Sequence, residues 1–118
     1  MERKVLIVTT IASMIKYFCM PLIDLLQKMG YEVQVACNFV DGNNISYDEV
    51  ADFKKELTEK NVVYYQIPFS RKITDSKNYQ CYKQLKRIVR QEKFSFIHCH
   101  TPIASLIARL VGRSTHTK

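Results

Sequence analysis

The sequence predicts an α/β fold in which a Rossmann-like parallel sheet carries helices on both faces. The chain holds four short runs rich in β-branched and aromatic residues, and a segment with helical spacing of apolar residues follows each one. The first run, residues 4–9, is apolar without alternation, which is typical of a strand buried on both faces of a parallel sheet. Alternating strands and helices indicate right-handed crossovers. We therefore expect the element order βαβαβαβα and the strand order 3-2-1-4.

The first strand is expected over residues 4–9, with a polar turn around residues 10–13. Apolar residues at helical spacing then predict a helix that ends at Gly30, and they are Met14, Phe18, Leu22, Leu25, Leu26 and Met29. Pro21 lies inside this pattern, so the helix is either kinked there or begins near that residue.

The middle of the chain is expected to contain a strand, a loop rich in turn-forming residues, a charged amphipathic helix and a third strand, over residues 32–37, 38–44, 47–60 and 62–67. The last part is expected to contain a helix, a strand and a further helix, over residues 77–92, 94–98 and 103–112. Thr101 is a good N-cap and Pro102 suits the first helical position, so the last helix begins directly after the fourth strand.

The expected strand order makes the first and fourth strands neighbours. Their carboxyl ends then flank the point where the connections leave the sheet in opposite directions, and open α/β sheets bind ligands at that point. This topology places residues 10–13 beside residues 98–101.

Length and composition describe one ordinary globular domain. Hydrophobic residues make up 47% of the 118 residues and charged residues 25%. No apolar run approaches the roughly 20 residues that cross a bilayer, and no secretory signal is recognisable. The four cysteines are widely spaced and are expected to be reduced core thiols, Cys19, Cys37, Cys81 and Cys99. These features favour the cytoplasm, with attachment to the inner face of the cell membrane as an extension.

The net charge of +7 is unevenly distributed, because five cations cluster within and directly after the expected helix over residues 77–92, namely Lys83, Lys86, Arg87, Arg90 and Lys93. Such a cluster is either a solvated helix face or a surface for an anionic partner, such as phosphate or a lipid headgroup. Aromatic residues do not interleave with this charge as they do in nucleic-acid modules, so no nucleic-acid partner is expected.

The segment after the first strand lacks the glycines of a dinucleotide-binding loop, and no Walker loop is present. We therefore expect no nicotinamide or flavin cofactor. The hydroxyls of Thr9, Thr10 and Ser13 can instead donate to a sugar or a phosphate, or they form local turn and capping bonds.

Two histidines, His98 and His100, stand at the end of the fourth strand. We expect no metal, because zinc requires three or four ligands and no companion cluster is evident. His98 is expected to be partly buried, and His100 to point into the crevice as a hydrogen-bonding group. The helix that starts at Thr101 turns its N-terminal amides to the same crevice, which favours anionic oxygen.

Arg71 and Lys72 follow the third strand and belong to the same rim of the sheet. A rim guanidinium can clamp a phosphate, although an exposed loop charge explains these residues equally well. The candidate substrate-binding residues are therefore Thr10, Ser13, Arg71, His100 and Thr101, and no catalytic residue is identified.

The chain resembles the N-terminal domain of family-4 glycosyltransferases of the GT-B fold, especially the bacterial branch that builds capsular and extracellular polysaccharide and lipopolysaccharide. Segments spread over nearly the whole chain carry the resemblance, and they are residues 4–10, 25–33, 67–71 and 97–102, with Arg109. The segment 97–102 is the most specific of them, because the first two are common to many Rossmann-like domains.

The resemblance implies a hexosyltransferase that moves a sugar from a nucleotide-sugar donor to a growing glycan or a polyprenyl-linked oligosaccharide, with retention at the anomeric carbon and no metal. In this family the N-terminal domain shapes the acceptor side, and a second domain holds most of the donor. The resemblance also offers the basic helices a partner in an anionic membrane surface.

The chain departs from the family pattern at two points. Many members carry a Gly-Gly pair where this sequence has Ser13-Met14, and the nucleotide-binding domain has no counterpart within residues 1–118. We therefore expect one acceptor-side domain over residues 1–118, truncated before the donor domain and inactive alone. The alternatives are a non-catalytic flavodoxin-like binding or regulatory domain, and the partner subunit of a two-chain transferase.

The expected strand over residues 94–98 forms an apolar edge of the sheet. Because exposed edges invite pairing, we expect self-association through it, or its burial by the tail of the chain.

Overall fold

A computed structural model describes residues 3–40, 46–69, 77–99, 102–115 and 117. The strands are β1 (Lys4–Ile11), β2 (Glu32–Asn38), β3 (Val63–Gln66) and β4 (Phe96–Cys99). The helices are α1 (Ala12–Met14), the π-helical turn η1 (Ile15–Cys19), α2 (Met20–Lys28), α3 (Tyr47–Glu59), α4 (Lys77–Glu92) and α5 (Pro102–Thr115).

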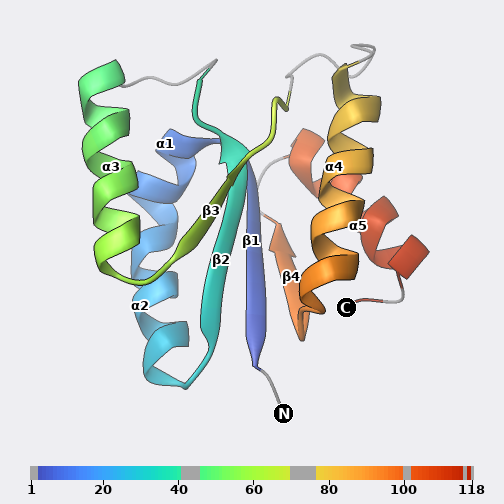
Figure 1. Cartoon of the computed structure of the whole chain (residues 1–118), viewed down its shortest axis with the longest axis horizontal. Helices are drawn as coiled ribbons and strands as arrows, with labels where there is room; N and C mark the ends of the chain where they lie inside the picture. The colour runs from blue at the N-terminus through green and yellow to red at the C-terminus, as the bar shows by residue number, and fades with distance from the viewer. Residues whose placement is uncertain (1–2, 41–45, 70–76, 100–101, 116, 118) are drawn as a thin grey trace.

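The four strands form one parallel sheet in the order β3-β2-β1-β4, which confirms the predicted fold class and strand order. In Figure 1 the helices α1, α2 and α3 lie on one side of the sheet, and α4 and α5 lie on the other.

Each face of the sheet has its own hydrophobic core. Val5 and Ile7 of β1 pack with residues of α2 and α3, whereas Leu6 and Val8 pack with residues of α4 and α5. Successive side chains of a strand point to opposite faces of the sheet. The side chains of β1 are therefore buried on both faces. This confirms the prediction that the continuous apolar run is a strand buried on both faces of the sheet.

The helix ends follow their local signals. Gly30 has a φ of 92°, and its N–H donates to the carbonyl of Gln27 while the N–H of Tyr31 donates to the carbonyl of Leu26. This pair of bonds is the Schellman arrangement that ends a helix. Pro102 is the first residue of α5, as the sequence predicts.

The junction of β1 and the first helix differs from the prediction. The prediction of a polar turn at residues 10–13 is wrong, because β1 continues to Ile11 and α1 begins at Ala12. Pro21 lies in the first turn of α2, directly after η1. A new α-helical segment therefore begins near the proline, as one of the two sequence-based alternatives predicts. A π-helical turn holds more residues than an α-helical one and shifts the residues that follow around the axis.

The predicted apolar stripe of this first helix is mostly not its buried side. Of the six residues, only Leu26 is buried, whereas Phe18, Leu25 and Met29 are more than half exposed. The core is formed instead by a neighbouring stripe, Ile15, Cys19, Ile23 and Leu26.

Other bounds shift by a few residues. The strand expected at residues 94–98 runs over Phe96–Cys99, and α5 continues past Gly112 to Thr115. A Cβ at Gly112 would lie 2.9 Å from the backbone oxygen of Thr117, so this glycine permits the close return of the chain and does not end the helix. The loop predicted at 38–44 loses Asn38 to β2, and residues 41–45 lie outside the described ones.

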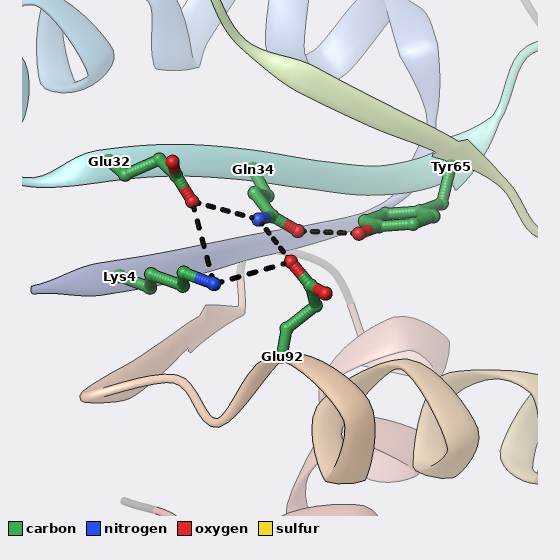
Figure 2. A network of polar contacts seen from close by, with 5 residues as sticks. All are labelled: Lys4, Glu32, Gln34, Tyr65 and Glu92. Carbon is green, nitrogen blue, oxygen red and sulfur yellow. Dashed lines mark hydrogen bonds and ion pairs between the residues drawn. The ribbon is translucent and has the colours of Figure 1, made fainter. Parts of the chain in front are cut away.

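A polar network joins the end of α4 to the amino-terminal edge of the sheet (Figure 2). Lys4 Nζ lies 3.5 Å from Glu92 Oε1 and 3.9 Å from Glu32 Oε2. Gln34 Nε2 donates to Glu92 Oε1 at 2.9 Å, and Tyr65 Oη donates to Gln34 Oε1 at 2.6 Å. The network lies at the edge of the sheet opposite the strand ends expected to bind a ligand, so it serves the attachment of α4.

Candidate functional site

The candidate site is the carboxyl edge of the sheet where β1 and β4 lie side by side. Ile7 pairs with His98 and Val8 with Cys99, so the two strands end close together. From there β1 leads into α1, whose Ala12 belongs to the core on one face, whereas α5 contributes Ile107 to the core on the other. The two connections therefore diverge, and a divergence of this kind opens a crevice at the strand ends.

Two of the predicted site residues are described, and both stand at this edge. Thr10 is the next-to-last residue of β1 and is 5% exposed, and Ser13 lies in α1 and is 3% exposed. Each already takes part in an interaction within the protein. Both residues are therefore almost completely buried at the carboxyl edge of the sheet and already engaged within the protein. Arg71, His100 and Thr101 lie outside the described residues, as does Lys72.

The end of β1 is shaped by a local hydrogen bond. The hydroxyl of Thr9 donates to the carbonyl of Ile11 at 2.9 Å, so for this threonine the alternative of local bonding holds. The pairing of β1 with β2 also shifts between Val8 and Ile11. Such an irregularity bends a strand and redirects its side chains. It allows β1 to pass into α1 without an intervening glycine loop.

A pair of amides, Asn38 and Gln66, organises the neighbouring strand ends, and sequence reasoning missed it. Gln66 Nε2 donates to Asn38 Oδ1 at 3.0 Å, and Asn38 Nδ2 donates to the carbonyl of Phe69 at 3.2 Å. Gln66 Oε1 in turn accepts from the N–H of Phe39 at 2.6 Å. The sequence offered one indication of this pair, because Asn38 directly follows an apolar strand. The sequence-based prediction placed Asn38 in the loop over residues 38–44. These bonds fix the backbone that leaves β2 and β3 at the rim of the site.

The cysteines near the site have the character of core residues. Cys37 is fully buried near the end of β2, and burial raises its pKa well above the usual thiol value, with the nearby Cys19 adding to the effect. Burial also raises the pKa of Cys19. Both thiols therefore stay protonated at neutral pH and are poor nucleophiles.

The histidine of β4 is also placed as predicted, because His98 is partly buried within the sheet beside Ile7. Within the described residues, no group of three or more histidine, cysteine, aspartate or glutamate side chains is arranged to hold a metal ion.

A groove of about 190 Å³ lies between β4 and α5, and it is lined by Ile97, Cys99, Ala108, Arg109, Gly112 and Thr117. Its size suits a few atoms, whereas ligand pockets for larger molecules usually measure about 300–1,000 Å³. The groove is therefore too small to hold a whole sugar substrate by itself. Among the described lining residues, Arg109 is the one cation.

Among the described helices, none is both long enough and apolar enough to cross a bilayer.

Comparison with known proteins shows which family the chain resembles over almost its whole length. Residues 4–117 match the model of a family described as "Glycosyl transferase 4-like". A relative named "Putative glycosyltransferase EpsD", from Bacillus subtilis strain 168, is 31% identical over 113 residues. The alignment covers 96% of this chain and 26% of the relative, so the chain spans about a quarter of that protein.

Two solved structures share the fold. A glycosyltransferase from Rickettsia africae superposes with a TM-score of 0.69 at 11% identity, covering all of this chain and 29% of the other. MurG from Acinetobacter baumannii superposes with a TM-score of 0.67 at 17% identity, covering 95% of this chain and 31% of the other. At such identities the likeness concerns the fold alone.

Proposed function

This chain belongs to the glycosyl transferase 4-like family, and from that premise we propose that it forms the acceptor-side N-terminal domain of a glycosyltransferase. The whole enzyme would transfer a hexosyl group, with retention, from a nucleotide-sugar donor to a growing polysaccharide or a lipid-linked oligosaccharide. A second domain beyond the spanned quarter would hold the nucleotide, so residues 1–118 alone would be inactive.

The match over residues 4–117 carries this proposal, because it aligns the complete β1–β4 framework with a glycosyltransferase family. The geometry of the strand ends agrees with an acceptor role. The hydroxyls of Thr10 and Ser13 stand at the end of β1, and α5 begins directly beyond β4. The amides at a helix N-terminus favour anionic oxygen, such as the diphosphate of a polyprenyl-linked acceptor.

In this arrangement the domain supplies binding and orientation. The hydroxyls would position a sugar or phosphate of the acceptor, and the N-terminus of α5 would receive negative charge. Holding the acceptor in one geometry lowers the entropic part of the barrier to transfer. Arg71, His100 and Thr101 belong to the same rim in the sequence order and complete the proposed set. The reaction would take place on the cytoplasmic side of the membrane without a metal.

Nuclear magnetic resonance titration of the isolated chain tests the proposal. A water-soluble acceptor mimic, a short-chain prenyl diphosphate sugar, is expected to shift the amide signals of residues 10–13 and of the start of α5. A uridine diphosphate sugar is expected to shift them weakly or not at all. Tight, stoichiometric binding of the nucleotide sugar, with no response to the acceptor mimic, would overturn the assignment of the acceptor side.

A further inference from the structure

We propose that two copies of this chain associate through the exposed apolar side of η1 and α2, packed antiparallel against the same elements of the second copy. We call this surface the outer stripe and define it by Tyr17, Phe18, Pro21, Leu22, Leu25 and Met29. The inference goes beyond the proposed function, because it concerns the assembly of the protein and requires no sugar transfer.

The segment of η1 and α2 is apolar on two of its sides. Its inner side is buried in the core, where Ile15 and Ile23 are inaccessible to solvent. On the outer side Phe18 is 64% exposed and Leu25 is 55% exposed. A helix that is apolar all round is normally covered all round, and a contiguous exposed apolar patch marks an interaction site. The described part of the chain covers only the inner side.

The spacing of the outer stripe fits a second helix. Phe18, Leu22, Leu25 and Met29 follow one another at intervals of four, three and four residues. This is the heptad spacing by which one helix packs along another. A second copy presents the same row of side chains, so a twofold axis makes the surface complementary to itself.

The extent of the outer stripe is sufficient for a dimer. Tyr17, Phe18, Leu25 and Met29 are each more than half exposed and together offer on the order of 450 Å² of mainly apolar surface. A stable interface buries about 800 Å² on each partner, of which about 55–65% is apolar. The outer stripe therefore supplies about the apolar share of one side of such an interface.

The charges beside the outer stripe are largely balanced within the chain. The charged residues of segment 12–28 are Lys16, Asp24 and Lys28. Lys16 Nζ lies 3.4 Å from Glu49 Oε2, and Lys60 Nζ donates to Asp24 Oδ1 at 2.7 Å. A nearly neutral apolar surface has little attraction for lipid phosphates or for nucleic acid. It therefore favours a protein as partner.

The excess positive charge of the chain lies on the other side of the sheet. Residues 1–76 contain nine Lys and Arg and ten Asp and Glu, whereas residues 77–118 contain nine Lys and Arg and a single carboxylate. The second part includes α4 and α5, which lie on the side of the sheet opposite α2 (Figure 1). Two copies that meet through α2 keep these positive helices apart, so their mutual repulsion is small.

The sequence favours an antiparallel arrangement of the two copies. With the twofold axis near Leu22, Phe18 of each copy faces Leu25 of the other, and Met29 faces Met14. A parallel arrangement would instead set each charged residue of segment 12–28 beside the identical charge of the second copy. The antiparallel register also brings the end of the second copy's α2 to Met14, which directly follows Ser13 of the candidate site.

Sedimentation equilibrium of the 118-residue protein tests the inference, and we expect a monomer–dimer equilibrium. Phe18→Gln/Leu25→Gln is expected to raise the dissociation constant on the order of a hundredfold, because both copies lose two apolar contacts. Glutamine preserves helix propensity, and circular dichroism checks that the variant is folded. The matched control is Tyr79→Gln/Leu106→Gln, which changes exposed apolar residues of α4 and α5 and is expected to leave the constant unchanged.

Disulfide cross-linking tests the antiparallel register. The background is Cys99→Ser, because the other three cysteines are buried. Leu22→Cys lies near the axis and is expected to form a covalent dimer under mild oxidation. Met29→Cys is the control, since its two copies would lie roughly 20 Å apart and a disulfide requires α-carbons within about 7 Å. Cross-linking of Met29→Cys but not of Leu22→Cys would overturn the proposed arrangement.

Three other outcomes would overturn the inference. The first is a strictly monomeric wild type. The second is a dissociation constant that Phe18→Gln/Leu25→Gln leaves unchanged while exchange slows in residues 96–99, which would assign the contact to β4. The third is a monomer that floats with phosphatidylcholine vesicles through the same residues. Because no substrate takes part, these outcomes are independent of the acceptor titration.

Discussion

At the scale of single residues, Gly30 shows how one position connects sequence to fold. Its positive φ lets the chain leave α2 and enter β2 with only Tyr31 following, and the two Schellman bonds satisfy carbonyls that the helix end would otherwise leave unpaired. A Cβ there would meet Arg3 Nη1 at 3.7 Å, an ordinary contact. The requirement for glycine is therefore conformational and does not come from crowding.

We predict that Gly30→Ala lowers the free energy of unfolding by about 1–2 kcal/mol, because an L-residue with a β-carbon is strained at this φ. Gly30→Asn is the matched control and is expected to cost less, since asparagine tolerates the left-handed region. Urea denaturation followed by circular dichroism measures both. Equal stability of the alanine variant and the wild type would show that the backbone adapts.

The two described candidate site residues allow a second prediction at this scale. Thr10→Val/Ser13→Ala is expected to weaken binding of the acceptor mimic about tenfold, because it removes donors to a charged or sugar oxygen. The control is Thr58→Val on α3, whose hydroxyl donates to the carbonyl of Lys54 and which lies on an exposed helix face. If both variants bind the mimic like the wild type, the hydroxyls of Thr10 and Ser13 have a purely structural role.

At the scale of elements, α4 is attached to the sheet by its buried face and by the network at its end. Gln34 is almost completely buried, and its amide is bonded to both Glu92 and Tyr65. The hydrogen bond from Gln34, assisted by Lys4, lowers the pKa of Glu92. Burial, with smaller contributions from Glu92 and Glu32, raises the pKa of Tyr65, which keeps the phenol protonated as a donor.

This network predicts a pH dependence of stability. Because the pKa of Glu92 is lower in the folded than in the unfolded protein, its contribution is present above about pH 4.5 and is lost as the pH falls through the folded-state pKa. Glu92→Gln is expected to be less stable than the wild type near neutral pH, and the difference should vanish in acid. Glu59→Gln, an exposed change on α3, is the control. Urea denaturation from neutral to acid pH measures the free energy of unfolding of the variants and the wild type. A stability difference between Glu92→Gln and the wild type that stays constant at every pH would contradict the role of Glu92.

At the scale of the whole molecule, β4 forms one edge of the sheet. All four residues of Phe96–Cys99 are partly exposed, although Phe96 packs edge-on against Tyr31 with ring centroids 5.7 Å apart. The sequence analysis also offered burial of this edge strand by the C-terminal tail. Thr117 lies near the strand, because it lines the same groove as Ile97 and Cys99.

We predict concentration-dependent self-association of the 118-residue protein through β4, because an open parallel edge presents unpaired backbone groups. Sedimentation analysis should show a dimer at high concentration, and the amides of residues 96–99 should exchange more slowly as it forms. A strictly monomeric mass with fast exchange in those residues would contradict the prediction.

Most of the fold could be predicted because its signals are local. The boundaries of α4 match the prediction, and the strand order is the one expected for a doubly wound sheet of alternating strands and helices. The prediction was wrong where a choice depended on distant residues. Both stripes of the first helix are apolar, and packing against the sheet and α3 selects the one with Ile15 and Ile23. The location of the site at the strand ends stays a prediction, and the Asn38–Gln66 pair found there joins residues 28 positions apart and has no periodic signal.

The sequence by itself determined that β1 is buried on both faces, that Gly30 ends a helix and Pro102 begins one, and that the positive charge gathers in residues 77–118. These properties depend on residues that are near neighbours along the chain. Only the tertiary structure decided which side of the first helix is exposed, that Lys4 meets Glu92, and that α4 and α5 bring their charge to one side of the sheet. Those outcomes depend on contacts between distant segments, which form only when the sheet brings the segments together.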